Sequence, residues 1–225
     1  EISHYNVLSL LSWVEREFSQ QQLQRILLST SISFDPSVLE IFATLCFGNT
    51  GVLVENGLSL LEQPVDVSYI ATVPSVVRAL VDNNAIPAGV KLIGVGGEVL
   101  TTELVNRVFE QHATLSLYNF YGPTECTVNA TCESFNGKIE ETPAIGKPLT
   151  NTDVYVLSRH QQLLPVGALG ELYIGGKAVA RGYHNRPDLT DERFCTLAAL
   201  PDAGRLYRTG DLVRFLEDGR LSFQG

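Results

Sequence analysis

A hydroxyl and a carboxylate stand side by side at Thr124 and Glu125, directly after the turn-forming pair Gly122-Pro123. A threonine hydroxyl can hydrogen-bond a phosphate oxygen, and a glutamate beside it can hold Mg²⁺ while the cation bridges phosphates. The aromatic face of Tyr121 can stack on a purine. The alternative is an ordinary surface turn with an N-capping threonine, and this stretch alone does not decide between the two.

The residues before the turn set its position. The apolar run from Leu115 to Tyr118 predicts the end of a buried strand, and Gly-Pro breaks the strand after it. Thr124 and Glu125 are therefore expected on a loop just past the carboxyl end of a strand, where ligands bind in open α/β sheets.

Two further stretches carry groups suited to a nucleotide. Gly96-Gly97-Glu98 follows an apolar run, and its glycines would let backbone approach a flat ligand, or simply form a tight strand-to-helix turn. It is not the dinucleotide fingerprint. Asp211 follows Gly210 in a predicted turn. Its carboxylate can accept two hydrogen bonds from a ribose diol, although aspartate is also common in turns for local backbone reasons.

A third carboxylate, Asp35, precedes a predicted helix. Ser37 and Glu40 have the spacing of a capping box, in which the serine caps the helix and the glutamate bonds back to the cap. If Ser37 is the cap, Asp35 is not needed there and its carboxylate is available for another role.

Composition narrows the class of protein. The chain has 225 residues, a formal net charge of −9 and no run of Lys or Arg, which argues against a nucleic-acid surface. The four cysteines form no CxxC pair, as in an acidic protein of a reducing, cytoplasmic compartment. No apolar run approaches the roughly 20 residues that span a bilayer. The chain contains no methionine, so we expect a fragment of a longer polypeptide.

The element pattern predicts an α/β fold, a mostly parallel sheet with crossover helices. The expected helices cover 7–18, 38–47, 74–83 and a segment capped by Thr101 or Thr102, and the expected strands cover 25–29, 51–55, 67–72 and 92–95. From about residue 142, proline and glycine are frequent and apolar runs are short, at 154–157, 169–174 and 221–223, which indicates a small antiparallel barrel or sandwich. We place an α/β subdomain at 1–140 and a β-rich, barrel-like subdomain at 141–225.

The ordered set of motifs resembles the adenylate-forming superfamily, and more closely the adenylation domain of a nonribosomal peptide synthetase. The resemblance covers essentially the whole chain. It rests on Phe34-Asp35-Pro36-Ser37, Gly96-Gly97-Glu98, Asn119 through Glu125, Gly170 through Gly176, Ala180-Arg181-Gly182-Tyr183 and Tyr207 through Leu212.

The resemblance implies a function. Such domains use ATP to convert an amino acid to an aminoacyl adenylate, and then load it on the phosphopantetheine thiol of a carrier protein. It implies that Glu125 binds Mg²⁺ and Thr124 contacts phosphate. Tyr121 would stack on adenine beside Gly122, Asn119 and the backbone at Gly97 would read its edge, and Asp211 would hold the ribose.

The resemblance also implies an amino-acid pocket. Asp35 would pair with the α-ammonium of the substrate. The side-chain pocket would be lined by Pro36, Leu39, Thr72, Gly94, Gly96, Phe120, Val128 and Asn129. None of these lining residues is charged, so a charged substrate side chain would be buried without a partner. Gly94 and Gly96 are expected to leave space in the wall, which favours a fairly large neutral side chain with a polar tip.

The resemblance is to only part of such a domain. The glycine-rich phosphate loop and the C-terminal lobe with its catalytic lysine have no counterpart here, so the fragment alone is expected to be inactive. The implied partners are a carrier domain in the same chain, a condensation domain and a small activator protein. The alternatives are an acyl- or aryl-CoA ligase of the same superfamily, which has no ammonium for Asp35 to neutralise, and a catalytically silent scaffold that kept the fold.

Overall fold

The computed structural model describes residues 1–225, which form two compact units. We call residues 14–120 and 134–143 the α/β unit, and residues 1–13, 121–133 and 144–225 the β unit. The predicted boundary at residues 140 and 141 lies near the last passage of the chain between the units, at 143–144, but the chain also passes between them at 13–14, 120–121 and 133–134.

Parallel strands form the sheet of the α/β unit, in the order β2-β1-β3-β4-β5. They are β1 (Arg25–Leu28), β2 (Thr50–Leu53), β3 (Tyr69–Thr72), β4 (Leu92–Val95) and β5 (Ser116–Tyr121). All four residues of β4 are buried, as expected for a strand covered on both faces. The register pairs Gly94 with Tyr118 and Val95 with Asn119, so the ends of β4 and β5 lie side by side.

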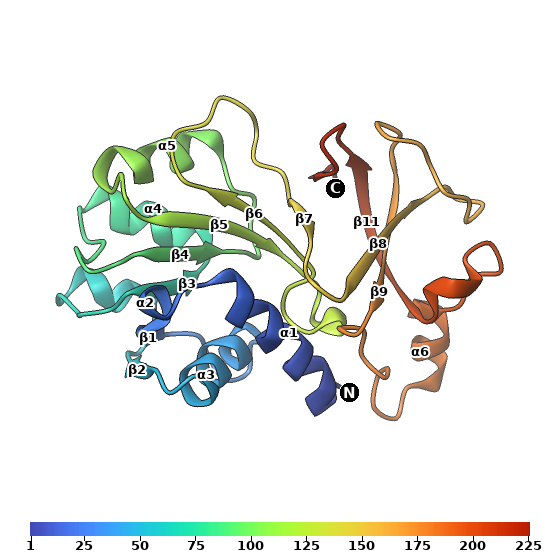
Figure 1. Cartoon of the computed structure of the whole chain (residues 1–225), viewed down its shortest axis with the longest axis horizontal. Coiled ribbons are helices and arrows are strands. Elements are labelled where there is room, and N and C mark those ends of the chain that lie inside the picture. The colour runs from blue at the N-terminus through green and yellow to red at the C-terminus, as the bar shows by residue number, and fades with distance from the viewer. The chain divides into compact units, whose positions relative to one another are not determined.

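Helices cover both faces of this sheet. Figure 1 shows α3 (Pro36–Cys46) on one face and α4 (Pro74–Asp82) with α5 (Thr102–Gln111) on the other. The chain also forms α1 (His4–Glu17), α2 (Gln20–Leu23) and the 3₁₀ helix η1 (Gly57–Leu61). The core beneath α4 and α5 includes Ile70, Ile93 and Leu104, each at most 1% exposed.

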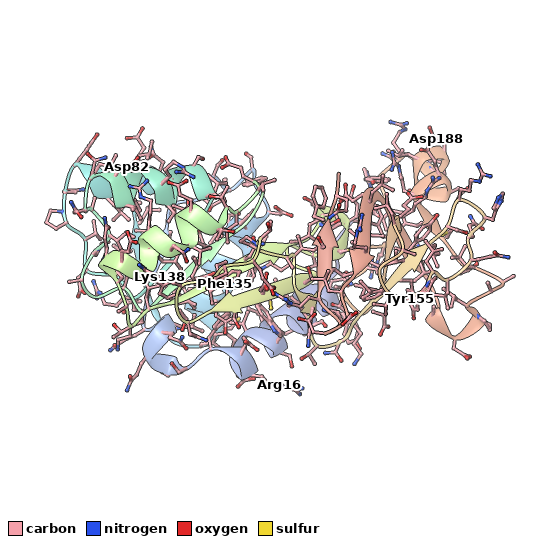
Figure 2. All side chains as sticks on the ribbon, turned by 90° about the horizontal axis from the view of Figure 1, so that it is seen from above. Arg16, Asp82, Phe135, Lys138, Tyr155 and Asp188 are labelled. Atoms are coloured by element: carbon pink, nitrogen blue, oxygen red, sulfur yellow. The ribbon has the colours of Figure 1, made fainter.

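The β unit is built on an antiparallel sheet with strand order β10-β11-β9-β8, and β12 pairs with β11. Its strands are β8 (Thr152–Leu157), β9 (Gly170–Gly176), β10 (Phe194–Cys195), β11 (Leu206–Phe215) and β12 (Leu221–Phe223). Strands β6 (Thr131–Phe135) and β7 (Lys147–Pro148) pair with each other, and α6 (Pro187–Arg193), η2 (Thr124–Cys126) and η3 (Pro201–Ala203) complete the elements. Figure 2 draws every side chain, with Asp82 of α4 and Asp188 of α6 labelled at the outer surfaces of their units.

The α/β fold class and the antiparallel second part are confirmed, but the structure corrects three local predictions. The capping box is wrong: Glu40 bonds to Ser29 and Thr30 instead of the helix start, and the N-cap of α3 is Asp35. Strand β5 does not end at Tyr118 but runs to Tyr121.

The third correction concerns Asp211, which lies within β11 and not in a turn between elements. The pairing of β11 with β9 shifts register between Arg208 and Leu212, and Gly210 in that interval has φ +88°. This β-bulge re-aims the side chain of Asp211, as bulges commonly do at functional sites.

No helix in the structure combines the length and apolarity that a membrane span requires.

Candidate active site

The loop that carries Thr124 and Glu125 leaves β5 at Tyr121 and returns beside it at Ala130. The N–H of Ala130 donates to the carbonyl oxygen of Tyr121 over 2.8 Å, which closes the loop. A Cβ on Gly122 would lie 2.6 Å from the Cα of Asn129 and 2.7 Å from the nitrogen of Ala130. Glycine is therefore required at 122 because the returning backbone passes directly against it.

The returning arm of this loop has an unusual backbone. Thr127 and Val128 have φ values of +58° and +72°, and the N–H of Asn129 donates to the carbonyl of Thr127 over 2.9 Å, a γ-turn around Val128. A β-branched residue rarely adopts positive φ, so neighbouring contacts must impose it. One such contact is the hydroxyl of Thr127, which is buried and donates to the carbonyl of Ala178 over 2.7 Å.

Glu125 is held from two sides within the β unit. The hydroxyl of Tyr183 donates to its carboxylate, and its carbonyl accepts the N–H of Ala180 over 2.8 Å. Burial raises the pKa of Tyr183, and the hydrogen bond to Glu125 adds to the rise. Burial also raises the pKa of Tyr207, helped by its hydrogen bond with Tyr183 and the charge of Glu125. Both phenols therefore stay protonated at neutral pH and can donate to a carboxylate.

The residues around Glu125 fit a magnesium ion that is shared with phosphate. No cluster of three or more histidine, cysteine or acidic side chains forms a metal site made of protein ligands alone. Mg²⁺ commonly takes only one or two carboxylates and completes its shell with water and substrate phosphates. Glu125 is half-buried, whereas Thr124 beside it is exposed. One carboxylate and one accessible hydroxyl suit such a shared cation.

Tyr121 and Asp211, which the sequence separates by 90 positions, meet in the β unit. The hydroxyl of Tyr121 donates to Oδ2 of Asp211, and the Tyr121 ring lies 6.2 Å from the ring of Phe223. Burial, followed by the bond to Asp211, raises the pKa of Tyr121. The hydroxyl of Thr209 accepts the N–H of Asp211 over 3.0 Å, which fixes the bulge. The β unit thus brings together the predicted adenine and ribose contacts.

The predicted ammonium site lies in the α/β unit, at the start of α3. Asp35 is half-buried and makes no side-chain capping bond, because Pro36 at the first helical position supplies no N–H to cap. The loop before it is fixed by Glu40, which is 1% exposed and accepts from the backbone N–H groups of Ser29 and Thr30 over 3.1 and 3.2 Å. Leu39 is buried, at 3% exposure.

The space over Gly94 and Gly96 is not open, which corrects the expectation for the pocket wall. A Cβ on Gly94 would lie 3.1 Å from Cδ2 of Phe120 and closer still to Cε2, and a Cβ on Gly96 would lie 3.0 Å from the carbonyl oxygen of Phe120. Both glycines are needed because β5 packs tightly against β4. The hydroxyl oxygen of Thr72 lies beside Gly57 of η1, 3.3 Å from the position of a Cβ there.

The turn after β4 has a structural role as well. Gly97 has φ +78°, which favours glycine, and Glu98 accepts two hydrogen bonds of 2.9 Å from the N–H and hydroxyl of Ser75. Its carboxylate thus satisfies the start of α4, a contact between loops that sequence spacing does not reveal. Asn119 is 6% exposed in β5. Val128 and Asn129 belong to the β unit, whereas the other predicted pocket residues belong to the α/β unit.

Sequence reasoning missed Tyr183 and Tyr207 as partners of Glu125. Both stand in stretches that carry the resemblance, but phenols 58 and more positions away give no local signal of a contact with a carboxylate.

Comparison with known proteins places these features in context. The family model described as "AMP-binding enzyme" matches residues 1–184. The chain is 42% identical over 226 residues to a linear gramicidin synthase protein of Brevibacillus parabrevis, covering 100% of this chain and 4% of the synthase. It is 41% identical over 229 residues to the AMB antimetabolite synthetase AmbB of Pseudomonas aeruginosa, covering 100% of this chain and 18% of AmbB. The chain therefore spans a small part of these relatives.

Solved structures agree. A four-domain nonribosomal peptide synthetase bound to AMP and glycine superimposes with a TM-score of 0.87 at 35% identity, covering 100% of this chain and 17% of that one. A nonribosomal peptide synthetase protein with adenylation and carrier domains superimposes with a TM-score of 0.83 at 30% identity, covering 98% of this chain and 46% of that one.

Proposed function

Because the chain belongs to the AMP-binding enzyme family, we propose that it is part of an adenylation domain that activates an amino acid with ATP in nonribosomal peptide synthesis. The products of the first step are an aminoacyl adenylate and pyrophosphate. The acyl group is then transferred to the phosphopantetheine thiol of a carrier domain, the principal partner. The unpaired state of all four cysteines suits a reducing, cytoplasmic setting.

The meeting of Tyr121 with Asp211, next to the loop of Glu125, carries the proposal. An aromatic face and a carboxylate joined by one hydrogen bond offer a stacking surface and a diol acceptor for one nucleoside. Thr124 and Glu125 then serve the phosphates. We assign Asn119, Gly122 and the turn Gly96-Gly97-Glu98 to the surroundings of the base, as the family resemblance implies.

The first step requires alignment and charge neutralisation more than proton transfer. The substrate carboxylate attacks the α-phosphorus of ATP, forms a P–O bond and expels pyrophosphate, and it is already ionised at neutral pH. Mg²⁺, when bound through Glu125, supplies neutralisation of phosphate charge. Thr124 donates a hydrogen bond to a phosphate oxygen, and Tyr183 holds the carboxylate of Glu125 in place.

We assign Asp35 to the substrate ammonium and a neutral pocket to the side chain. Pro36, Leu39, Thr72, Gly94, Gly96, Phe120, Val128 and Asn129 carry no charge, so acidic and basic amino acids should be the poorest substrates. The ring of Phe120 fills the space over Gly94, and therefore its orientation sets how deep the pocket is.

Asp35→Ala in the full-length synthetase tests the amino-acid assignment. A carboxylate that faces a buried ammonium costs about 3–5 kcal/mol to remove, so the KM for the amino acid should rise by about two orders of magnitude or more. The measurement is amino-acid-dependent ATP–pyrophosphate exchange, with Asp202→Ala on the exposed surface as the control. Unchanged exchange in Asp35→Ala would refute the assignment, and equal activity with des-amino acids would favour an acyl-CoA ligase.

A further inference from the structure

One buried hydroxyl in the α/β unit has no hydrogen-bond partner. Tyr69, the first residue of β3, is 1% exposed, and its hydroxyl oxygen is neither donor nor acceptor to any group in the structure. Its pKa is raised by burial and, to a smaller extent, by the charge of Glu40, so the phenol stays neutral. Leaving a buried hydroxyl unpaired costs folding free energy, and native proteins rarely do so without a reason.

The neighbouring aromatic side chains fix this hydroxyl in position. The ring of Tyr69 stacks on Phe18 with centroids 6.4 Å apart. Phe18 also packs edge-on against Tyr118, whose hydroxyl donates to Glu17 over 2.8 Å. Two tyrosines therefore share one cluster, and only Tyr118 has its hydroxyl satisfied by the protein.

The unpaired hydroxyl points to the residues assigned to the amino-acid pocket. Its oxygen lies 3.2 Å from the position that a Cβ on Gly94 would occupy, and the ring edge of Phe120 converges on the same point. Glycine at 94 leaves no side chain between the hydroxyl and the ring. Turning of Phe120 about its side-chain torsions would bring the hydroxyl into contact with whatever the pocket holds.

We propose that the Tyr69 hydroxyl binds an uncharged polar group, an amide or a hydroxyl, at the tip of the substrate side chain. This inference rests on the proposed function, because it takes Gly94 and Phe120 as pocket walls. A phenol offers one donor and an acceptor but no charge, so it satisfies a neutral polar tip and not a buried ion. Glu40 already accepts from Ser29 and Thr30 and is not available to compensate a charged substrate.

The test compares substrates of equal shape in the full-length synthetase. ATP–pyrophosphate exchange is measured with glutamine against methionine, asparagine against leucine and threonine against valine. Wild type should prefer the polar member of at least one pair. Tyr69→Phe should lower that preference about tenfold or more, as expected when one partner of a substrate hydrogen bond is removed, while kcat/KM for the apolar member stays the same.

Two variants separate this role from a structural one. Tyr118→Phe should lower the melting temperature without changing the polar-to-apolar ratio, whereas Tyr69→Phe, which loses only an unpaired oxygen, should melt no lower than wild type. Phe120→Ala should increase the preference for long polar side chains, and adding Tyr69→Phe should cancel the increase.

Several outcomes would overturn the proposal. They are an unchanged ratio in Tyr69→Phe, a wild-type preference for the apolar member of every pair, or an effect of Phe120→Ala that persists without the Tyr69 hydroxyl. Active wild type with an unchanged ratio would leave the proposed function intact, whereas exchange with no amino acid at all would refute both.

Discussion

At the scale of single residues, the surroundings of two glutamates in the β unit explain why only one is suited to a metal. Glu133 is 8% exposed and forms an ion pair with Arg220, so its charge is already neutralised. Glu125 receives a hydrogen bond from the neutral phenol of Tyr183 and no ion pair. A carboxylate that is oriented but not neutralised retains its affinity for a divalent cation.

Tyr183→Phe should therefore loosen magnesium binding without removing the ligand. A hydrogen bond to a charged group contributes about 1.5–3 kcal/mol, which corresponds to an increase of about tenfold or more in the magnesium concentration for half-maximal pyrophosphate exchange. Glu125→Gln should remove most activity at any magnesium concentration, and Glu217→Gln on the exposed surface is the control. If Tyr183→Phe lowers kcat at saturating magnesium and leaves the magnesium midpoint in place, Tyr183 does not act through Glu125.

At the scale of elements, the loop from Tyr121 to Ala130 depends on one close backbone approach. Gly122→Ala puts a methyl group against the carbonyl of Val128 and within 2.7 Å of the nitrogen of Ala130. Backbone on both sides leaves no flexible side chain to move, so the variant should lose about 1–3 kcal/mol of unfolding free energy. Gly137→Ala is the matched control, since a Cβ there meets nothing within 4 Å. Equal denaturant midpoints for the two variants would contradict the argument.

The link between α3 and the loop at Ser29 and Thr30 makes stability depend on pH. Burial raises the pKa of Glu40, against smaller opposing contributions from its hydrogen bonds to Thr30 and Ser29. Between the unfolded and folded pKa values the native state binds more protons than the unfolded state, so stability is greatest below the unfolded value of about 4.5 and falls as pH rises through the folded value.

Glu40→Gln should reduce this fall in stability. Its amide oxygen can accept from both N–H groups, and its NH₂ can donate to the hydroxyl of Thr30. Denaturant unfolding at a series of pH values between 4 and 8 should give a flatter profile for the variant. An equally steep decline in both proteins would mean that Glu40 is ionised at no cost.

At the scale of the whole molecule, ligand binding should be visible as stability of the full-length chain. A ligand that binds only the folded state at about 100 times its Kd adds about 2.7 kcal/mol. MgATP should therefore raise the melting temperature of wild type, and Asp211→Ala should reduce the rise because it removes the ribose acceptor paired with Tyr121. Equal shifts in both proteins would remove Asp211 from the nucleotide site.

Features determined by local sequence were predictable, and features determined by distant partners were not. The apolar run of β4 was predicted to its end residues because both faces of the strand are buried. Strand β5 was predicted too short, because Asn119 and Phe120 continue it through pairing with β4, which a polar asparagine does not announce. Glu40 was misassigned because donors 10 and 11 positions away compete with the local cap.

The same distinction applies to the candidate site. The types of residue that handle phosphate, cation and ribose could be read from Thr124, Glu125 and Asp211, since their chemistry is their own. The phenol on Glu125 and the ring over Gly94 could not, because each comes from another strand or loop that only the fold brings near. The bulge at Asp211 likewise arises from a register shift between two strands.

The γ-turn at Val128 has a consequence for attempts to redesign substrate choice. Val128 and Asn129 are natural positions to randomise, yet they also form the arm that returns the Glu125 loop to β5. Glycine at 128 would relieve the steric penalty of φ +72° and give the arm freedom that valine denies it. Libraries that vary this position will therefore exchange selectivity against catalytic rate, and useful variants will be those that keep the arm rigid by other means.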